Sequence, residues 1–342
     1  VTGAQIGFDD MGVGAHLVYL VDVSGSMMDA DKLGLAKASL RMLTDSLRPT
    51  DTVSLVTYAG SVRLVLPPTT VARRADILAA IDDLSAEGST AMGDGLKLAY
   101  EQAESSFVRG NINRVIVLYD GEANVGATSH EEILKSIEAQ RKKGITLSTV
   151  GFGQSVYNDE MMEQLADAGD GNYQYIDSPT EAKRAFTAQL DTMIGVVARD
   201  VKIQVDFDPL RVRSYRLIGY ENRDVADVDF ENDAVDGGEV GPGHAATAIY
   251  DVVLKSTWPA VHGSGWVSVN LRYKPADGGP SRGFSFPLGK HHASFEAAPA
   301  DMRFATAVAA MSEKLRESPY ATSWRKTLIR DIADESSFAV PQ

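Results

Sequence analysis

The first half of the chain alternates short apolar runs with amphipathic segments. Leu17 to Val21 is apolar without interruption, which is typical of a strand buried on both faces. Apolar residues then recur every three or four positions from Leu33 to Leu47, which predicts a helix over 31–47. Further strands are expected at 52–58, 62–66, 113–119, 146–152 and 173–176, and further helices at 73–84, 93–107, 131–143, 159–168 and 180–197. This alternation predicts an α/β fold with a doubly wound, mostly parallel sheet.

The pattern changes near residue 198, where strands follow one another without helices between them. Strands are expected at 201–207, 212–220, 246–254, 266–273 and 283–287, and two closing helices at 300–316 and 323–333. Several of these strands alternate apolar and polar residues, which is typical of a sheet with one face exposed to solvent. We therefore divide the chain into a lead segment (1–14), an α/β domain (15–197) and a β-rich module with C-terminal helices (198–342).

Composition narrows the classes of function. The 342 residues include 33 Lys and Arg against 47 Asp and Glu, a net charge of −14, which disfavours binding to nucleic acid. The absence of cysteine excludes disulfides and thiolate catalysis. No run reaches the ~18 apolar residues of a membrane span. The chain starts at Val1 rather than Met, so we expect the native N-terminus upstream, where a signal peptide or lipid anchor would lie.

Oxygen donors follow the predicted strands at one edge of the sheet. Asp22, Ser24 and Ser26 form a D-x-S-x-S motif directly after the first strand. Thr90 precedes the helix at 93, and Asp120 follows the strand 113–119. Ligands bind at this edge of open parallel sheets, and these hard donors suit Mg²⁺, with Mn²⁺ or Ca²⁺ as alternatives. A coordination position left open would accept a carboxylate from a partner protein.

In these motifs the sequence resembles the von Willebrand factor type A domain and its metal-ion-dependent adhesion site. It is closer still to a bacterial group in which this domain precedes a characteristic C-terminal region of unknown function. The stretches that resemble the group are Leu20–Met27, Tyr58–Gly60, Asn113–Ile116, Gly151–Gly153, Gly171–Tyr173, Tyr215–Arg223 and Gly238–Gly241. The resemblance implies six strands, one antiparallel, and a metal surrounded by Asp22, Ser24, Ser26, Thr90 and Asp120. Tyr119 stands where many relatives have Thr, a position that is not a ligand.

The expected function is a divalent-metal-dependent protein-binding module for adhesion or assembly, in which a partner Asp or Glu completes the coordination. The resemblance suggests a bacterial cell-envelope or secreted protein. The alternative is a cytoplasmic subunit that works with an AAA-type ATPase in metal insertion or protein maturation. A third hypothesis is a metal-free scaffold. The sequence does not indicate an oligomeric state.

Enzymatic activity is not expected. Ser24 and Ser26 lack a G-x-S-x-G context, the histidines lack H-x-x-x-H spacing, and no P-loop is present. We therefore assign no catalytic residue and no organic cofactor.

Two further features of the sequence each allow two interpretations. The acidic loop 222–243 either binds a second cation or is simply solvated, and the pair Met27–Met28 either contacts a partner or covers the first helix.

Overall fold

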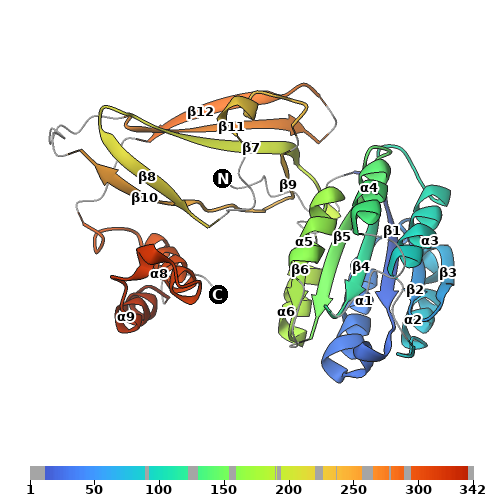
Figure 1. Ribbon diagram of the computed structural model, residues 1–342. Helices are drawn as coiled ribbons and strands as arrows, with labels where there is room; N and C mark the ends of the chain where they lie inside the picture. Colours follow the sequence, from blue (N-terminus) through green and yellow to red (C-terminus); the bar gives the residue numbers. More distant parts are fainter. Residues whose placement is uncertain are drawn as a thin grey trace.

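The computed structural model places a six-stranded sheet in the first half of the chain (Figure 1). It describes residues 12–88, 92–121, 130–153, 159–188, 190, 194–219, 226–235, 237–255, 265–276, 279–288 and 294–337. The strands of this sheet are β1 (Ala15–Asp22), β2 (Thr52–Tyr58), β3 (Val62–Thr70), β4 (Ile112–Tyr119), β5 (Thr146–Phe152) and β6 (Tyr173–Ile176). Their order is β3-β2-β1-β4-β5-β6, with only β3 antiparallel to its neighbour. The predicted fold class is confirmed.

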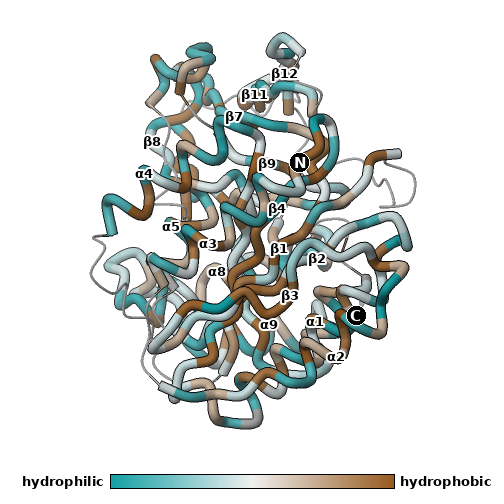
Figure 2. Tube along the Cα trace, turned by 90° about the vertical axis from the view of Figure 1, so that its right-hand side faces the viewer, coloured by the Kyte–Doolittle hydropathy of each residue, from teal (hydrophilic) through white to brown (hydrophobic). Residues whose placement is uncertain are grey.

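Helices cover both faces of this sheet. One face carries α1 (Leu35–Asp45), α2 (Arg74–Asp82) and α6 (Pro179–Lys183), and the other carries α3 (Met92–Ser105), α4 (His130–Arg141) and α5 (Asp159–Ala168). Successive residues of a strand point to opposite faces, so Leu17 and Tyr19 pack into the first layer and Val18 and Leu20 into the second. The central strands are among the most hydrophobic segments in Figure 2.

The helix expected at 31–47 begins differently from the prediction. A 3₁₀ turn, η2 (Gly25–Met28), follows the D-x-S-x-S aspartate, and a π-helical turn, η3 (Ala30–Gly34), precedes α1. A similar π-helical turn, η5 (Arg184–Ala188), continues α6. Hydrophobic spacing reports which face of a helix is buried, but it does not report this change in backbone winding.

The second half of the chain forms two antiparallel sheets and two helices. One sheet has the order β12-β11-β7-β9, and the other pairs β10 with β8. Their bounds are β7 (Ala198–Phe207), β8 (Val212–Ile218), β9 (Gly238–Val240), β10 (Ile249–Leu254), β11 (Val267–Pro275) and β12 (Arg282–Leu288), followed by α8 (Ala300–Leu315) and α9 (Lys326–Ser337). The rings of Phe207 and Tyr215 stack 4.4 Å apart between the sheets. The short strand β9 was not predicted.

This β-rich part joins the α/β domain at the edge where the parallel strands begin. The Val197 N–H donates to the Val240 carbonyl at 2.8 Å. Arg114, near the start of β4, is buried and donates to Thr146 Oγ1 and Ser148 Oγ at 2.9 and 3.1 Å. Burial lowers the pKa of Arg114 to about 10, and the charge of Glu239 in β9 opposes this shift. The junction therefore lies opposite the edge that carries Asp22.

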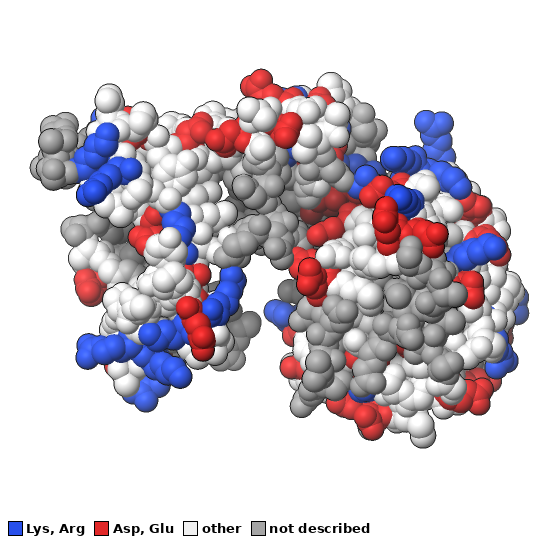
Figure 3. Space-filling model, in the orientation of Figure 1, with Lys and Arg blue, Asp and Glu red and all other residues white. Residues whose placement is uncertain are grey.

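The surface carries both signs of charge. Figure 3 shows Lys and Arg gathered over α8 and α9 in this view, and Asp and Glu on both lobes. Within the part of the chain that the structure describes, no helix is long and apolar enough to cross a membrane.

Candidate metal centre

The strand order brings two aspartates to one point of the sheet. β1 lies between β2 and β4, so the order of the strands reverses between β1 and β4, which is where open parallel sheets bind their ligands. Val21 pairs with Leu118, which places Asp22 at the end of β1 beside Asp120 just after β4. Both aspartates are fully buried. Two carboxylates buried at the same edge are energetically costly unless a cation balances their charge.

The D-x-S-x-S loop folds back on its aspartate. The Ser24 N–H donates to Asp22 Oδ1 at 2.7 Å, and the hydroxyls of Ser24 and Ser26 share a hydrogen bond of 2.9 Å. The other oxygen, Asp22 Oδ2, is buried and has no hydrogen-bond partner among the described residues. The predicted residues Asp22, Ser24 and Ser26 are therefore together, with one carboxylate oxygen left to bind a further group.

A neighbouring loop is hydrogen-bonded to this one. The Gly25 N–H donates to the Gly88 carbonyl at 3.0 Å, and the Glu87 N–H donates to the Val23 carbonyl at 2.7 Å. Gly88 has a φ of +81°, and a Cβ there would lie 3.2 Å from the Gly60 nitrogen, so a side chain would be both strained and crowded. These hydrogen bonds hold Glu87 and Gly88 against the D-x-S-x-S loop, and Gly88 is two residues before Thr90. Thr90 itself lies outside the described residues.

The sequence patterns did not indicate one residue of this cluster. The ammonium group of Lys32 donates to Asp120 Oδ2 and to the Ser26 carbonyl, both at 3.0 Å, and Lys32 is only 5% exposed. Lys32 stands four positions before Ala36, on the stripe of the helix that faces the core. A lysine on an apolar stripe is a signal that could have identified it.

The electrostatics of the site favour a bound cation. Burial raises the pKa of Asp22 to about 6, and the charge of Asp120 adds to this effect, while hydrogen bonds from Ser24 oppose it. Tyr58, paired with Asp22 across β1 and β2, has a pKa well above its ordinary value, first because it is buried and then because of the Asp22 charge. The cluster of two carboxylates and one ammonium remains formally negative.

The residues present fit a divalent metal ion. The donors are carboxylate and hydroxyl oxygens, which suit hard cations such as Mg²⁺, Mn²⁺ and Ca²⁺. The unpartnered Asp22 Oδ2 is placed where a cation would satisfy it. Among the described residues, the site brings together two carboxylates, those of Asp22 and Asp120. Consistent with that, no group of three or more His, Asp or Glu residues among the described residues is arranged to hold a metal.

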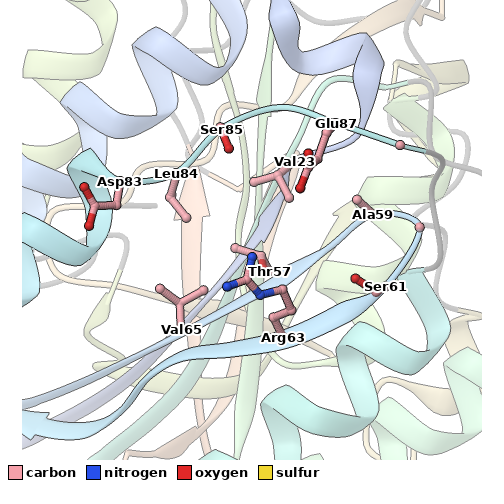
Figure 4. A pocket seen from close by; sticks show the side chains of 12 residues that line it. Val23, Thr57, Ala59, Ser61, Arg63, Val65, Asp83, Leu84, Ser85 and Glu87 are labelled. Atoms are coloured by element: carbon pink, nitrogen blue, oxygen red, sulfur yellow. The ribbon is translucent and has the colours of Figure 1, made fainter.

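A pocket of about 500 Å³ adjoins the site (Figure 4). Thr57, Ser61, Arg63 and Val65 of the β2–β3 hairpin form one wall. The opposite wall is formed by residues 83–85, 87 and 88, and Val23 of the D-x-S-x-S loop lies at the edge of the pocket. The pocket therefore offers charged and neutral polar groups beside the metal loop.

The two interpretations left open for Met27–Met28 apply to one residue each. Met27 is fully buried in the core, whereas Met28 is 74% exposed on the same loop. Met27 therefore packs into the core, and Met28 is exposed beside the D-x-S-x-S motif.

Described acidic residues of the loop 222–243 bind neighbouring side chains of the β-rich part. Asp227 accepts from Gln204 at 3.1 Å, and Asp233 binds Arg272 and Ser281 at 2.9 and 2.6 Å. These contacts tie the loop to strands and the segment beside them. Residues 222–225 and Asp236 lie outside the described residues, so the second-cation interpretation stays untested for the whole loop.

Comparison with known proteins identifies two domain families in the chain. The von Willebrand factor type A domain matches residues 16–189, and a domain described as "Uncharacterized protein YfbK, C-terminal" matches residues 192–339. The chain is 40% identical over 345 residues to "Uncharacterized protein YfbK" of Escherichia coli (strain K12), which covers 96% of the chain and 59% of that protein. It is 26% identical over 278 residues to "Uncharacterized protein sll0103" of Synechocystis sp., which covers 80% of the chain and 64% of that protein. The chain thus spans about three fifths of the length of these relatives.

A solved structure supports the fold. The von Willebrand factor type A protein from Catenulispora acidiphila aligns with 96% of the chain and 80% of its own length, with a TM-score of 0.57 and 20% sequence identity. This similarity covers the β-rich part as well as the α/β domain. At this identity it is a statement about fold alone.

Proposed function

The chain belongs to the von Willebrand factor type A family, and from this membership we propose that it is a divalent-metal-dependent protein-binding module. The observation that carries the proposal is the pair of fully buried carboxylates, Asp22 and Asp120, with Asp22 Oδ2 unpartnered among the described residues. A divalent ion bound there would offer an open coordination position to a carboxylate of a partner protein. Ser24 and Ser26 would serve as neutral ligands, and Thr90 is the proposed fifth ligand.

The surroundings of the site support a protein partner. Met28 is exposed beside the D-x-S-x-S loop, and methionine adapts its shape to different contacts. The pocket between the hairpin and residues 83–88 has Arg63, Asp83 and Glu87 among its lining residues. We propose that the partner's Asp or Glu binds at the ion and that its neighbouring side chains contact Met28 and this pocket.

We propose binding rather than catalysis. The Ser24 hydroxyl shares a hydrogen bond with the Ser26 hydroxyl. His16 bonds to Asn111 and His130 to Gln164, so neither is arranged as the partner of a serine nucleophile. We propose that the chain holds oxygen donors in place at this edge of the sheet and presents the surrounding loops to a partner.

We further propose a role in adhesion or assembly at the bacterial cell envelope or outside the cell, which follows from the family resemblance. The alternative, a cytoplasmic subunit partnered with an AAA-type ATPase, would use the same edge of the sheet. Fractionation of cells separates the two, because recovery of the full-length protein from the cytosol alone would contradict the envelope placement.

The proposed binding is tested with peptides that differ at one position. Immobilised peptides carrying Asp, Glu, Asn or Gln at that position are probed with the chain in Mg²⁺, Mn²⁺ or EDTA. We expect retention on the Asp and Glu peptides only, only with an ion, and not by Asp22→Ala. Asp82→Ala is the matched control, since Asp82 is an exposed carboxylate paired with Arg41 on the surface. Equal retention in EDTA, or equal retention on Asp and Asn peptides, would contradict the proposal.

A further inference from the structure

The Lys32 ammonium lies inside the proposed metal centre. It is 3.0 Å from Asp120 Oδ2 and 3.0 Å from the Ser26 carbonyl. The side chains of this ion pair are 6% and 0% exposed. Because Asp120 is one of the two carboxylates that would face a divalent ion, Lys32 already satisfies an oxygen that the ion would need.

The local backbone positions this lysine. Lys32 lies in the π-helical turn η3, and its N–H donates to the Asp29 carbonyl at 3.0 Å. Its aliphatic stem crosses Gly153 at the end of β5, where a Cβ would lie 3.0 Å from Lys32 Cγ. Gly153 has a φ of +94° and its carbonyl accepts from the Tyr175 hydroxyl. The positive φ favours glycine at this position, and a side chain there would crowd the Lys32 stem.

The charges explain what the lysine does. Asp22 and Asp120 are both fully buried, and two buried carboxylates are costly unless cations balance them. Lys32 supplies one positive charge in the metal-free protein. A divalent ion beside the same carboxylates would repel the ammonium strongly, since few water molecules screen charges at a buried site. The ammonium and the ion therefore compete for Asp120.

We propose that Lys32 is an internal counter-ion that occupies Asp120 in the metal-free protein and must leave it when a divalent ion binds. The displaced ammonium remains close to the site, because its side chain is anchored in η3, and it lies near the position where a partner's carboxylate would bind. Ion binding and carboxylate binding therefore reinforce each other, because the carboxylate replaces the partner that Lys32 has lost. This inference rests on the proposed function, and it names the residue that weakens ion binding when no acidic partner is present.

The opposite role would be that of a positioning residue, in which Lys32 holds Asp120 in the orientation that the ion requires. The two roles predict opposite effects of removing the charge. If Lys32 competes, its replacement by an uncharged side chain of similar length tightens ion binding. If it positions Asp120, the same replacement weakens ion binding.

The test is calorimetric titration of the whole chain with Mn²⁺ alone and with Mn²⁺ plus acetate, for wild type, Lys32→Met and Lys37→Met. Methionine keeps an unbranched stem over Gly153. Lys37 is the matched control, since its ammonium binds the Asp82 carbonyl on the surface at 2.8 Å. We expect Lys32→Met to bind Mn²⁺ alone about tenfold tighter or more, and to lose the gain in affinity that acetate gives wild type. Lys37→Met should match wild type.

The outcomes separate this inference from the proposed function. Equal or weaker Mn²⁺ binding by Lys32→Met overturns the inference and leaves the metal centre standing. Binding of Mn²⁺ alone by Lys32→Met but not by wild type supports the inference if acetate restores binding by wild type. Failure of wild type to bind even with acetate contradicts metal-dependent binding by the natural chain. Absence of binding by both variants contradicts the proposed function and the inference with it.

A second measurement needs no substitution and so does not depend on how a variant folds. Amine-acylating reagent is applied to wild type in EDTA and in Mn²⁺, and labelling is followed at individual lysines by mass spectrometry. We expect Lys32 to be protected in EDTA and labelled several-fold faster in Mn²⁺, while Lys37 is unchanged. Equal labelling of Lys32 in both conditions would overturn the displacement.

Discussion

At the scale of single residues, Asp22 resists ionisation in the metal-free fold. Its pKa rises from the ordinary 3.8 to about 6 because the carboxyl is buried. The folded state therefore holds a proton that the unfolded state releases between these values. Stability should fall as the pH rises from 4 to 6, and the full cost, about 3 kcal/mol, should remain above pH 6.

Chemical denaturation in EDTA at pH 4 to 7 measures this cost. Other groups titrate in the same range, so the informative quantity is the difference between wild type and Asp22→Asn, which keeps the shape but cannot ionise. Wild type should lose stability relative to Asp22→Asn as the pH rises. If the free energies of unfolding of the two proteins change with pH in parallel, ionisation of the buried Asp22 carboxyl does not destabilise the folded state, and the prediction is wrong.

Sequence motifs predicted some residues of the site and not others. Asp22, Ser24 and Ser26 are close in sequence, so one strand and one turn are enough to bring them together. Asp120 joins them only through the pairing of β1 with β4. The strand pattern predicted that both residues lie at the same edge of the sheet, but not that these two strands are neighbours. Lys32 was missed because lysines in amphipathic helices usually face solvent. Finding it requires noticing that it shares the buried stripe of Ala36 and Leu40.

At the scale of elements, buried strands were predicted most accurately. The expected ranges of β2, β5 and β6 agree with the structure at both ends. β2 and β5 are buried strands with clear limits. β6 is a short, partly exposed edge strand, and the glycine before it marks where it begins. β3 was predicted too short, since this edge strand is mostly polar or half-buried and continues through Pro67 and Pro68. The strand β9 has only three residues, too few for a pattern.

The turn between α5 and β6 depends on a glycine. A Cβ at Gly171 would lie 1.8 Å from the Leu147 carbonyl oxygen and 2.9 Å from Ser148 Oγ. Because the nearest atom belongs to the backbone of β5, no side-chain rotation relieves the clash. Gly171→Ala should lower the free energy of unfolding by more than about 2 kcal/mol in chemical denaturation.

Gly34→Ala provides the matched control. Gly34 has helical backbone angles, and a methyl group added there would have no neighbouring side chain or loop atom within 4 Å, so the same substitution should be tolerated. It should raise stability by about 0.5 to 1 kcal/mol, because alanine favours helix more than glycine. Comparable losses at both positions would contradict the packing described around Gly171.

At the scale of the whole molecule, the metal centre and the β-rich part occupy opposite edges of the sheet. Asp22 lies at the carboxyl ends of the parallel strands, and the junction with Glu239 and Val240 lies at their beginning, beside Arg114. A partner bound at the metal edge would thus be far from this junction. The C-terminal part is free to provide a second interface.

This arrangement predicts where an ion changes the protein. Hydrogen exchange measured with and without Mn²⁺ should show slower exchange in residues 22–28 and 85–88, whose backbones are hydrogen-bonded to each other. Amides of β11 and α8 should exchange at unchanged rates. Protection centred on the β-rich part would indicate an ion site elsewhere, such as the acidic loop.

The central claim is that Asp22 and its neighbours bind a divalent ion in the folded state. A thermal-shift titration of metal-free protein with Mg²⁺, Mn²⁺ and Ca²⁺, run on wild type, Asp22→Ala and the surface control Asp82→Ala, tests it most directly. An ion at a hundredfold excess over its Kd should stabilise wild type and Asp82→Ala by about 2.7 kcal/mol and raise Tm, with no such rise in Asp22→Ala. No shift with any of the three ions, or an equal shift in Asp22→Ala, would contradict the claim.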